Sequence, residues 1–437
     1  MIYSTLDIEK MNIEMKGKTV SKTLIEFFDK SPIENVVGTL LLNPDKVVYI
    51  GANKKQMKSQ IQNYQTLFHE RGILLEIECR VVGKHNLPQI QELLIDLVKE
   101  NHHCAIDLTG GDELSLVAVG SVAKTLLDQG EKISFHSINI NSRKVIRFIN
   151  EETETQDRDL FLTVPETIQL HGGAVIFEDN ATYRWDWSEE FERDLSILWE
   201  ISKENCSSWN LLITALSSYV TQDSLTVTVT GIRDEERPVS ASGRPRWIMP
   251  WQWSRGFFRK LQKAKLIFEY ENDDDGFSFT FKNEQIRRCL AKAGTVLELI
   301  VHQQMSQMAY KGGEKYFHDI LSSVYIDWDG VIHGKEEPEK DTVNEIDVMA
   351  IKGLVPYFIS CKNGEVTSDE FFKLNTVAER FGGKYARKIM VTTYMDKTAG
   401  GREHMIQRAH EMGITLIHDV HTMDSSQLHK ALKVACS

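Results

Sequence analysis

The first 150 residues alternate between short apolar runs and longer stretches with helical spacing. Apolar runs at 23–29, 46–52, 73–82 and 104–108 predict strands, as do 132–140 and 144–150. The segments between them, among them 54–71 and 87–101, have helical patterns. Strands that alternate with helices form doubly wound, mostly parallel sheets. The pattern therefore predicts an α/β fold with a Rossmann-like sheet in residues 1–150.

The pattern changes after residue 150. Residues 150–159 are acidic and predict a turn-rich break. Residues 191–220 have helical spacing, 224–234 alternate as a strand does, and two strand-like pieces, 265–271 and 276–281, flank a polar tip. Helices followed by a hairpin are typical of a winged helix. We expect a winged-helix-like linker domain over residues 151–283.

A third α/β pattern covers residues 284–437. It predicts a helix at 284–310, a strand at 323–332, two strands within 344–364, a helix at 368–383, a further strand, and a final helix–strand pair at 400–417. A chain of 437 residues is too long for one ordinary core, which agrees with three domains.

The two strands within 344–364 carry polar side chains where a buried sheet should have none. Residues two apart in a strand share a face, so Glu345 and Asp347 project together, and Ser360 projects with Lys362. Asp347 and Lys362 could form a structural ion pair. Glu298, however, also interrupts an apolar helix, and burial of an unpaired carboxylate is costly.

A helix with Glu298, a strand, a strand with Asp347, a strand ending in Lys362 and a helix resemble the PD-(D/E)xK nuclease superfamily. The resemblance implies that these three residues are catalytic and that Glu298 and Asp347 hold Mn²⁺ or Mg²⁺. Such an ion activates water and neutralises charge on the phosphate. Ser360 stands where the superfamily has a third acid, and serine is a poor metal ligand, so either the metal site has a weaker ligand set or another acid substitutes. Candidate substitutes are Glu365, Asp327 and Asp329.

Two loops of the first domain could bind an anion. Thr109, Gly110 and Gly111 follow an apolar strand and precede a helix, where backbone N–H groups attract phosphate. Asp112 fits equally well as the N-cap of that helix, and a tight turn without a ligand is the alternative. Lys30 and Ser31 follow the first strand. A GxGxxG fingerprint is missing there, which argues against a dinucleotide-dependent enzyme.

The whole chain resembles a CRISPR-associated family that joins a CARF sensor, a winged-helix-like linker and a PD-(D/E)xK nuclease. The stretches "SPIENVVGTLLL", "DLTGGDELSLVA" and 344–388 carry this resemblance. It implies a homodimer whose sensor binds cyclic tetra-adenylate through the two loops. It also implies metal-dependent cleavage of DNA, single-stranded RNA, or both, in type III CRISPR antiviral defence. The alternative is a ligand-sensing transcriptional regulator with an inactive nuclease domain.

Composition limits the partners. The formal charge of −12 gives no overall attraction to nucleic acid, so a nuclease needs a local basic surface. Candidates are the tryptophan-containing stretch 244–265, which could equally be core plus a solvated helix face, and a set near the third domain's long helix: Lys373, Arg380, Lys384, Arg387 and Lys388. Six scattered cysteines predict a reducing cytoplasm and no structural zinc. Neither a signal peptide at residues 1–18 nor a membrane span is expected.

Overall fold

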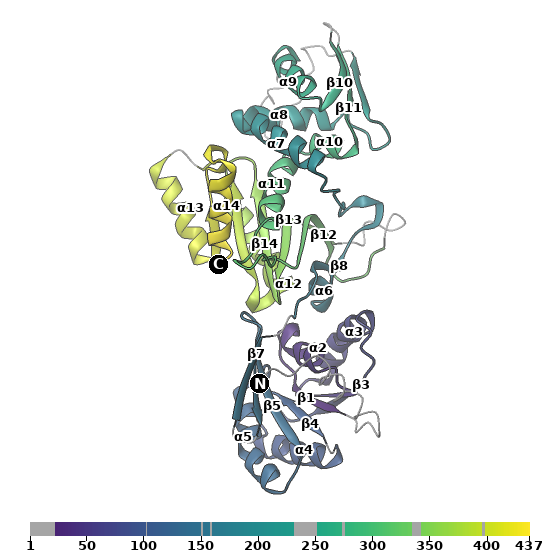
Figure 1. Ribbon diagram of the computed structural model, residues 1–437, viewed down its shortest axis with the longest axis vertical. Helices are drawn as coiled ribbons and strands as arrows, with labels where there is room; N and C mark the ends of the chain where they lie inside the picture. Colours follow the sequence, from purple (N-terminus) through teal and green to yellow (C-terminus); the bar gives the residue numbers. More distant parts are fainter. Residues whose placement is uncertain are drawn as a thin grey trace. The chain divides into compact units, whose positions relative to one another are not determined.

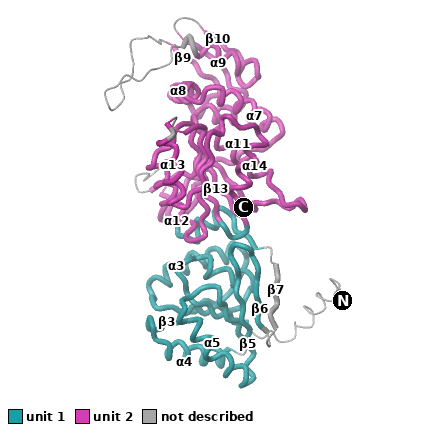
Figure 2. Tube along the Cα trace, turned by 90° about the vertical axis from the view of Figure 1, so that its left-hand side faces the viewer, with its two compact units in different colours: residues 1–173, 353–355 teal, residues 174–352, 356–437 magenta. Residues whose placement is uncertain are grey.

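The computed structural model describes residues 22–437 except 102, 150–151, 158–159, 231–250, 273–275, 334–341 and 396–397. The chain forms two compact units, residues 1–173 with 353–355 and residues 174–352 with 356–437 (Figure 2). The predicted boundary at residue 283 falls inside the second unit, and the division into three domains stays a prediction.

The first unit is built on a seven-stranded sheet of order β3-β2-β1-β4-β5-β6-β7. The first five of these strands pair in parallel, as predicted, and β6 and β7 add antiparallel neighbours. The strands are β1 (Thr23–Phe27), β2 (Lys46–Gly51), β3 (Glu76–Val81), β4 (Cys104–Asp107), β5 (Ile133–Asn139), β6 (Lys144–Ile149) and β7 (Glu152–Asp157).

Helices cover both faces of this sheet (Figure 1). They are the 3₁₀ turn η1 (Pro32–Asn35), α2 (Val37–Leu42), α3 (Lys54–Glu70), α4 (Leu87–Glu100) and α5 (Glu113–Asp128). A further helix, α6 (Val164–Leu170), packs on α3. Alternate strand residues such as Ile25, Val48 and Ile106 pack against α4 and α5 in one buried core. On the opposite face, Tyr49 contacts Tyr64 of α3.

The break predicted at 150–159 is wrong for most of that stretch, because Glu152–Asp157 form β7. This strand pairs in antiparallel register with β6. An unpaired strand edge offers a row of backbone donors and acceptors, and pairing with it is favourable even for an acidic sequence.

The second unit begins with β8 (Ala174–Val175) and the turn η2 (Glu178–Asn180) and continues into a helical and hairpin region. The elements of this region are α7 (Glu189–Glu204), α8 (Cys206–Ser217), β9 (Thr226–Thr230), α9 (Trp251–Lys263), β10 (Ile267–Asn272) and β11 (Gly276–Phe281), and its assignment as a winged helix stays a prediction. The three strands form an antiparallel sheet of order β10-β11-β9, and Phe258 of α9 packs on Phe277 and Phe279.

A six-stranded sheet of order β16-β15-β14-β13-β12-β8 completes the second unit. The strands are β12 (Asp319–Asp327), β13 (Val343–Lys352), β14 (Val355–Lys362), β15 (Arg387–Thr392) and β16 (Ile414–Ile417). The helices are α10 (Glu284–Cys289), α11 (Thr295–Ser306), α12 (Ser368–Gly382), η5 (Gly383–Tyr385), α13 (Ala399–Glu411), η6 (Val420–Thr422) and α14 (Ser425–Ala435). Helix α11 packs against β12, β13 and α14.

Two helix predictions in this region need correction. The single helix expected at 284–310 is two helices, α10 and α11, separated by the turn that contains Gly294. The chain also does not close with the pair at 400–417, because α14 follows it and packs on α11. In the part of the chain that the structure describes, no helix is both long and apolar enough to cross a membrane.

Candidate active site

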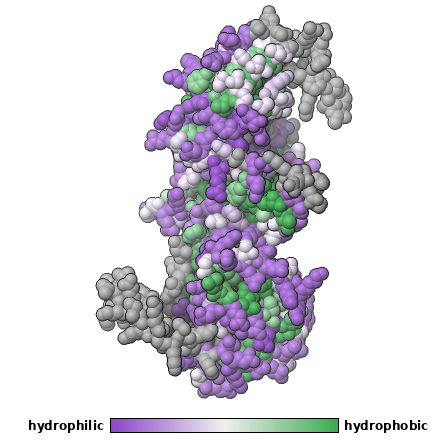
Figure 3. Space-filling model, turned by 90° about the vertical axis from the view of Figure 1, so that its right-hand side faces the viewer, coloured by the Kyte–Doolittle hydropathy of each residue, from purple (hydrophilic) through white to green (hydrophobic). Residues whose placement is uncertain are grey.

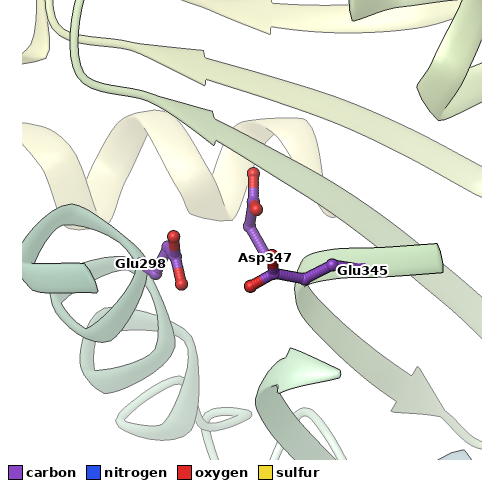
Figure 4. Close-up of side chains that lie close together, drawn as sticks. All are labelled: Glu298, Glu345 and Asp347. Carbon is purple, nitrogen blue, oxygen red and sulfur yellow. The ribbon is translucent and has the colours of Figure 1, made fainter. Parts of the chain in front are cut away.

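Three carboxylates converge between α11 and β13 (Figure 4). Glu298 extends from the first turn of α11, and Glu345 and Asp347 extend from one face of β13. One oxygen of each lies within 4.8 Å of the others. Grouped carboxylate oxygens are the ligands that Mg²⁺ and Mn²⁺ prefer, so the donor set fits such an ion.

Asp347 is held by the neighbouring strand. Its Oδ2 accepts a hydrogen bond from the backbone N–H of Cys361 at 2.6 Å and one from the Ser360 hydroxyl at 3.0 Å. Burial raises the pKa of Asp347, while Lys362 and the Cys361 N–H act against that shift. Both hydrogen bonds are made to Oδ2 and fix the orientation of the carboxylate.

Glu298 is buried, with a side chain only 2% exposed. Its Oε2 accepts a hydrogen bond from Ser323 at 2.8 Å, and a side chain at Gly294 would come within 2.9 Å of Oε1. Burial and the charge of Asp347 raise the pKa of Glu298 to about 7, against the opposing charge of Lys292. A carboxylate in this position needs a nearby cation to stay ionised.

Lys292, in the turn before α11, supplies positive charge to the cluster. Its Nζ pairs with Glu345 and lies 3.4 Å from Oε1 of Glu298. The two carboxylates raise the pKa of Lys292 although burial opposes them. Lys292 was not predicted from the sequence, because neither spacing nor hydrophobic pattern connects a turn residue with a strand 53 positions later.

Ser323 shows a local distortion of β12 at the same place. In the antiparallel register Ser322 pairs with Val348 and Val324 with Ile346, so Ser323 lies opposite Asp347. Its φ of 49° is in the left-handed region, which serine rarely adopts. Backbone outliers of this kind cluster at functional sites.

Lys362 ends β14 and lies beside Glu370 of α12, with 3.0 Å between Nζ and Oε2. Burial alone would lower the pKa of Lys362, but Asp347 and Glu370 outweigh it and raise that pKa. The amine therefore stays protonated. The elements that carry Glu298, Asp347 and Lys362 follow one another in the predicted order.

The candidates for the missing third acid do not join the cluster. Glu365 is an exposed residue beyond the end of β14. Asp327 accepts hydrogen bonds from the N–H groups of Gly330 and Val331, and Asp329 accepts one from Val331, so both carboxylates stabilise a turn. Glu345 is the third acid within ligand distance. The sequence signal was its i, i+2 spacing from Asp347.

His302 shares a face of α11 with Glu298 but has a packing role. Its ring stacks on Trp187 with 4.5 Å between centroids. Burial lowers the pKa of His302 to about 4, so the imidazole is neutral near pH 7.

In the first unit, the two predicted ligand loops lie against each other. Strands β1 and β4 are parallel neighbours, so their carboxyl ends share an edge. A side chain on Gly110 would come within 3.2 Å of the Phe27 carbonyl. Gly111 has a φ of 93°, and a side chain there would lie 2.7 Å from the Phe27 Cβ.

The polar residues of these loops differ in their hydrogen bonds and in their exposure. The Asp112 carboxylate accepts a hydrogen bond from the Ser115 N–H, so Asp112 is the N-cap of α5. This role is one of those that the sequence left open for Asp112. The Thr109 hydroxyl donates to Asp107 and accepts from the Ile138 N–H. Lys30 is exposed, whereas Ser31 is largely buried.

Three titratable side chains of β1, β4 and β5 are buried, and none of them was predicted from the sequence. Glu26, Asp107 and His136 are each at most 2% exposed, with 3.5 Å between His136 Nε2 and Asp107 Oδ2. Burial and the charge of Asp107 raise the pKa of Glu26 well above its usual value. Glu26 could not be recognised in the run "TLIEF", because a single acid in an apolar run can also mark the end of a strand.

Some residues of the predicted basic surfaces make contacts within the protein. Lys388 donates to the Met412 carbonyl and to Asn375, while Lys373 is exposed and lies 3.6 Å from Glu370. In the stretch 244–265, Phe258 and Leu261 are buried. Residues 244–250 and the side chains of Trp251 and Trp253 lie outside what the structure describes.

The fold is shared with solved proteins of low sequence identity. Protein VC1899 from Vibrio cholerae aligns with a TM-score of 0.68 at 18% identity, over 95% of this chain and 98% of that one. Can2 from Sulfobacillus thermosulfidooxidans, solved in complex with cyclic tetra-adenylate, aligns with a TM-score of 0.62 at 16% identity, over 95% of this chain and 99% of that one. No protein-family model matches the chain, and no curated protein sequence matches it.

Proposed function

We propose that the protein is a metal-dependent nuclease that cyclic tetra-adenylate activates in type III CRISPR antiviral defence. The observation that carries the proposal is the convergence of Glu298, Glu345 and Asp347 in a domain that also presents Lys362 in the nuclease order of elements. The fold shared with Can2, whose solved structure contains cyclic tetra-adenylate, supports the choice of activator. DNA, single-stranded RNA, or both are the substrates.

Glu298, Glu345 and Asp347 would hold the ion, Mn²⁺ or Mg²⁺. A bound divalent ion of this kind lowers the pKa of water and stabilises charge on a phosphate oxygen. Ser360 is not a ligand in this account. Its hydroxyl orients Asp347, and Glu345 supplies the third carboxylate that position 360 lacks.

Lys362 would act on the substrate. Held by Glu370 and kept protonated by its carboxylate neighbours, its amine stabilises negative charge that develops on the phosphate. Lys292 neutralises part of the charge of the cluster and opposes the rise in the pKa of Glu298, and a bound divalent ion would favour the ionised carboxylate further.

The loops after β1 and β4 would form the activator site. Gly110 and Gly111 bring backbone close to the end of β1, and exposed Lys30 adds positive charge. A homodimer would present two copies of this edge to a cyclic ligand with matching symmetry. Location in the cytoplasm stays a prediction.

A regulator that binds DNA without cutting it is the second candidate. The winged-helix order of elements and the exposed basic residues of α9, Arg259, Lys260 and Lys263, favour it. Sequence-selective binding of duplex DNA that depends on activator, with no cleavage in Mn²⁺, would support the regulator.

Cleavage assays test the proposal. Supercoiled plasmid, single-stranded DNA and single-stranded RNA are incubated with Mn²⁺ or Mg²⁺, with and without cyclic tetra-adenylate. We expect cleavage that needs both metal and activator and that falls by more than about 100-fold in Asp347→Asn, because a ligand is lost. Asp96→Asn, an exposed acid on α4, is the matched control and should cleave normally. Activator binding without cleavage of any substrate would overturn the proposal.

A further inference from the structure

A cavity of about 270 Å³ opens beside the three carboxylates, within the second unit. Its wall includes parts of the segment before α7, of α10, of the turn before α11 and of β12. Among its residues are Tyr183, Trp185, Arg288, Lys292, Ser323 and Tyr325. The volume lies just below the roughly 300–1,000 Å³ of typical small-molecule pockets, which suits one nucleoside rather than a long strand.

The cavity and the carboxylate cluster share residues. Ser323 lines the cavity and donates to Glu298 at 2.8 Å. Lys292 lines it and pairs with Glu298 and Glu345. Tyr325 lies opposite Glu345 in the sheet register. A group bound in the cavity is therefore next to a phosphate that reacts at the cluster.

The wall offers both cationic and aromatic contacts. The Arg288 guanidinium lies 4.0 Å from the centroid of the Tyr183 ring, and its Nε is held by Glu284 at 2.7 Å. Tyr183 meets Trp185 edge to face at 4.9 Å, and Trp185 stacks on Phe191 at 5.5 Å. These rings are thus fixed before any ligand binds.

The exposed part of this wall suits a nucleobase. Nucleobases have a flat face that stacks on aromatic rings such as that of Tyr183. The Nε1 of Trp185 is shielded from solvent, so Trp185 supports the wall through its ring contacts and is not a hydrogen-bond donor to the base.

We propose that this cavity binds the base of an unpaired nucleotide that flanks the scissile phosphate, with Tyr183 as the stacking residue and Arg288 and Lys292 as phosphate contacts. The inference rests on the proposed nuclease function and adds a substrate class to it. A base can enter the cavity only when it is unstacked, and unstacking costs least in a single-stranded substrate, which we therefore expect to be preferred.

An abasic scan tests the proposal with the full-length protein, Mn²⁺ and activator. After the cut is mapped on a single-stranded oligonucleotide, an abasic nucleotide is placed at each position around it. At one flanking position we expect a loss of kcat/KM of about tenfold, which is typical of one lost base–aromatic stack. In Tyr183→Ala, kcat/KM should fall by a similar factor on the intact oligonucleotide and should not fall further on the abasic one.

Tyr310→Ala is the control, because Tyr310 is partly exposed and does not line the cavity. Equal effects of abasic nucleotides at all positions, or equal losses for Tyr183→Ala on both oligonucleotides, would overturn the subsite while cleavage itself stands. If the wild type cuts nothing, the proposed function fails. The subsite is then tested by measuring the affinity for the oligonucleotide in the absence of metal. This affinity must fall about tenfold in Tyr183→Ala and stay unchanged in Tyr310→Ala.

Discussion

The Ser360 hydroxyl orients Asp347. In the PD-(D/E)xK superfamily, which this part of the chain resembles, the position of Ser360 holds a metal ligand. Ser360→Ala removes the 3.0 Å hydrogen bond to Oδ2 and leaves the bond from the Cys361 N–H. Loss of one hydrogen-bond partner of a metal ligand typically lowers metal affinity 10–100-fold, and we expect the lower end, about 10-fold, because the stronger anchor remains. Titration with Mn²⁺, followed by electron paramagnetic resonance, measures the change. Unaltered affinity would show that Ser360 does not orient the ligand.

His302 makes folding stability depend on pH. Its pKa is about 4 in the folded protein and 6.5 in the unfolded chain, so between these values the unfolded state binds more protons. Stability is therefore lost as pH falls from 6.5 to 4, by roughly 3 kcal/mol at most.

His302→Phe keeps an aromatic ring against Trp187 and cannot bind a proton. We expect its free energy of unfolding to fall less than that of the wild type between pH 6.5 and 4, as measured with denaturant. Parallel pH profiles for the two proteins would exclude a contribution from His302.

Backbone conformation decides whether the glycine in the loop after β4 and the glycine within α5 can be replaced. Gly111 has a φ of 93° and no room for a side chain beside Phe27, so Gly111→Ala should cost about 1–2 kcal/mol or more. A methyl group added at Gly120, in the middle of α5, would meet no atom within 4 Å. Gly120→Ala should instead stabilise by up to about 1 kcal/mol.

Thermal unfolding of the two glycine variants tests this contrast. The midpoint should fall for Gly111→Ala and rise for Gly120→Ala. If both variants shifted the midpoint in the same direction, the left-handed conformation would not be what requires Gly111.

At the scale of elements, hydrophobic spacing identified many of the strands and helices that have a buried face, but it missed α6 and α14, whose apolar residues are few. The parallel sheet of the first unit and the strands that carry Asp347 and Lys362 follow from it. Spacing failed for β7, whose polar sequence forms a strand because β6 offers an edge. It also failed for the turn between α10 and α11, whose single glycine, Gly294, is compatible with a continuous helix pattern.

For the candidate site, local sequence identified the residues that lie on regular elements. Glu298, Asp347 and Lys362 interrupt apolar patterns and could be recognised for that reason. Lys292, Ser323 and the cavity wall could not, because they meet the cluster only through tertiary packing. Glu345 was visible, but only the approach of α11 to β13 distinguishes a ligand from a solvated acid.

At the scale of the whole molecule, the expected homodimer can be tested on α5. Much of the surface in Figure 3 is hydrophilic, with hydrophobic residues in smaller patches. Leu116 and Leu127 are each 43% exposed and Val117 is 56% exposed, all on α5. Exposed apolar residues gathered on one helix are typical of an interaction surface.

Val117→Glu should shift the dimer toward monomer in sedimentation velocity experiments, because a charge would be buried at the interface. Val434→Glu, at a valine of α14 that is 70% exposed, is the matched control and should leave the mass unchanged. A dimer that tolerates Val117→Glu would exclude this face of α5.

The central claim is that Glu345 completes a metal centre that lacks the acid expected at position 360. Mn²⁺ affinity and activator-dependent cleavage of Glu345→Gln, with Glu365→Gln beside it, test this claim most directly. We predict that Glu345→Gln loses both metal binding and cleavage, whereas Glu365→Gln, at an exposed position, retains both. The reverse result, with Glu365 essential and Glu345 dispensable, would contradict the account.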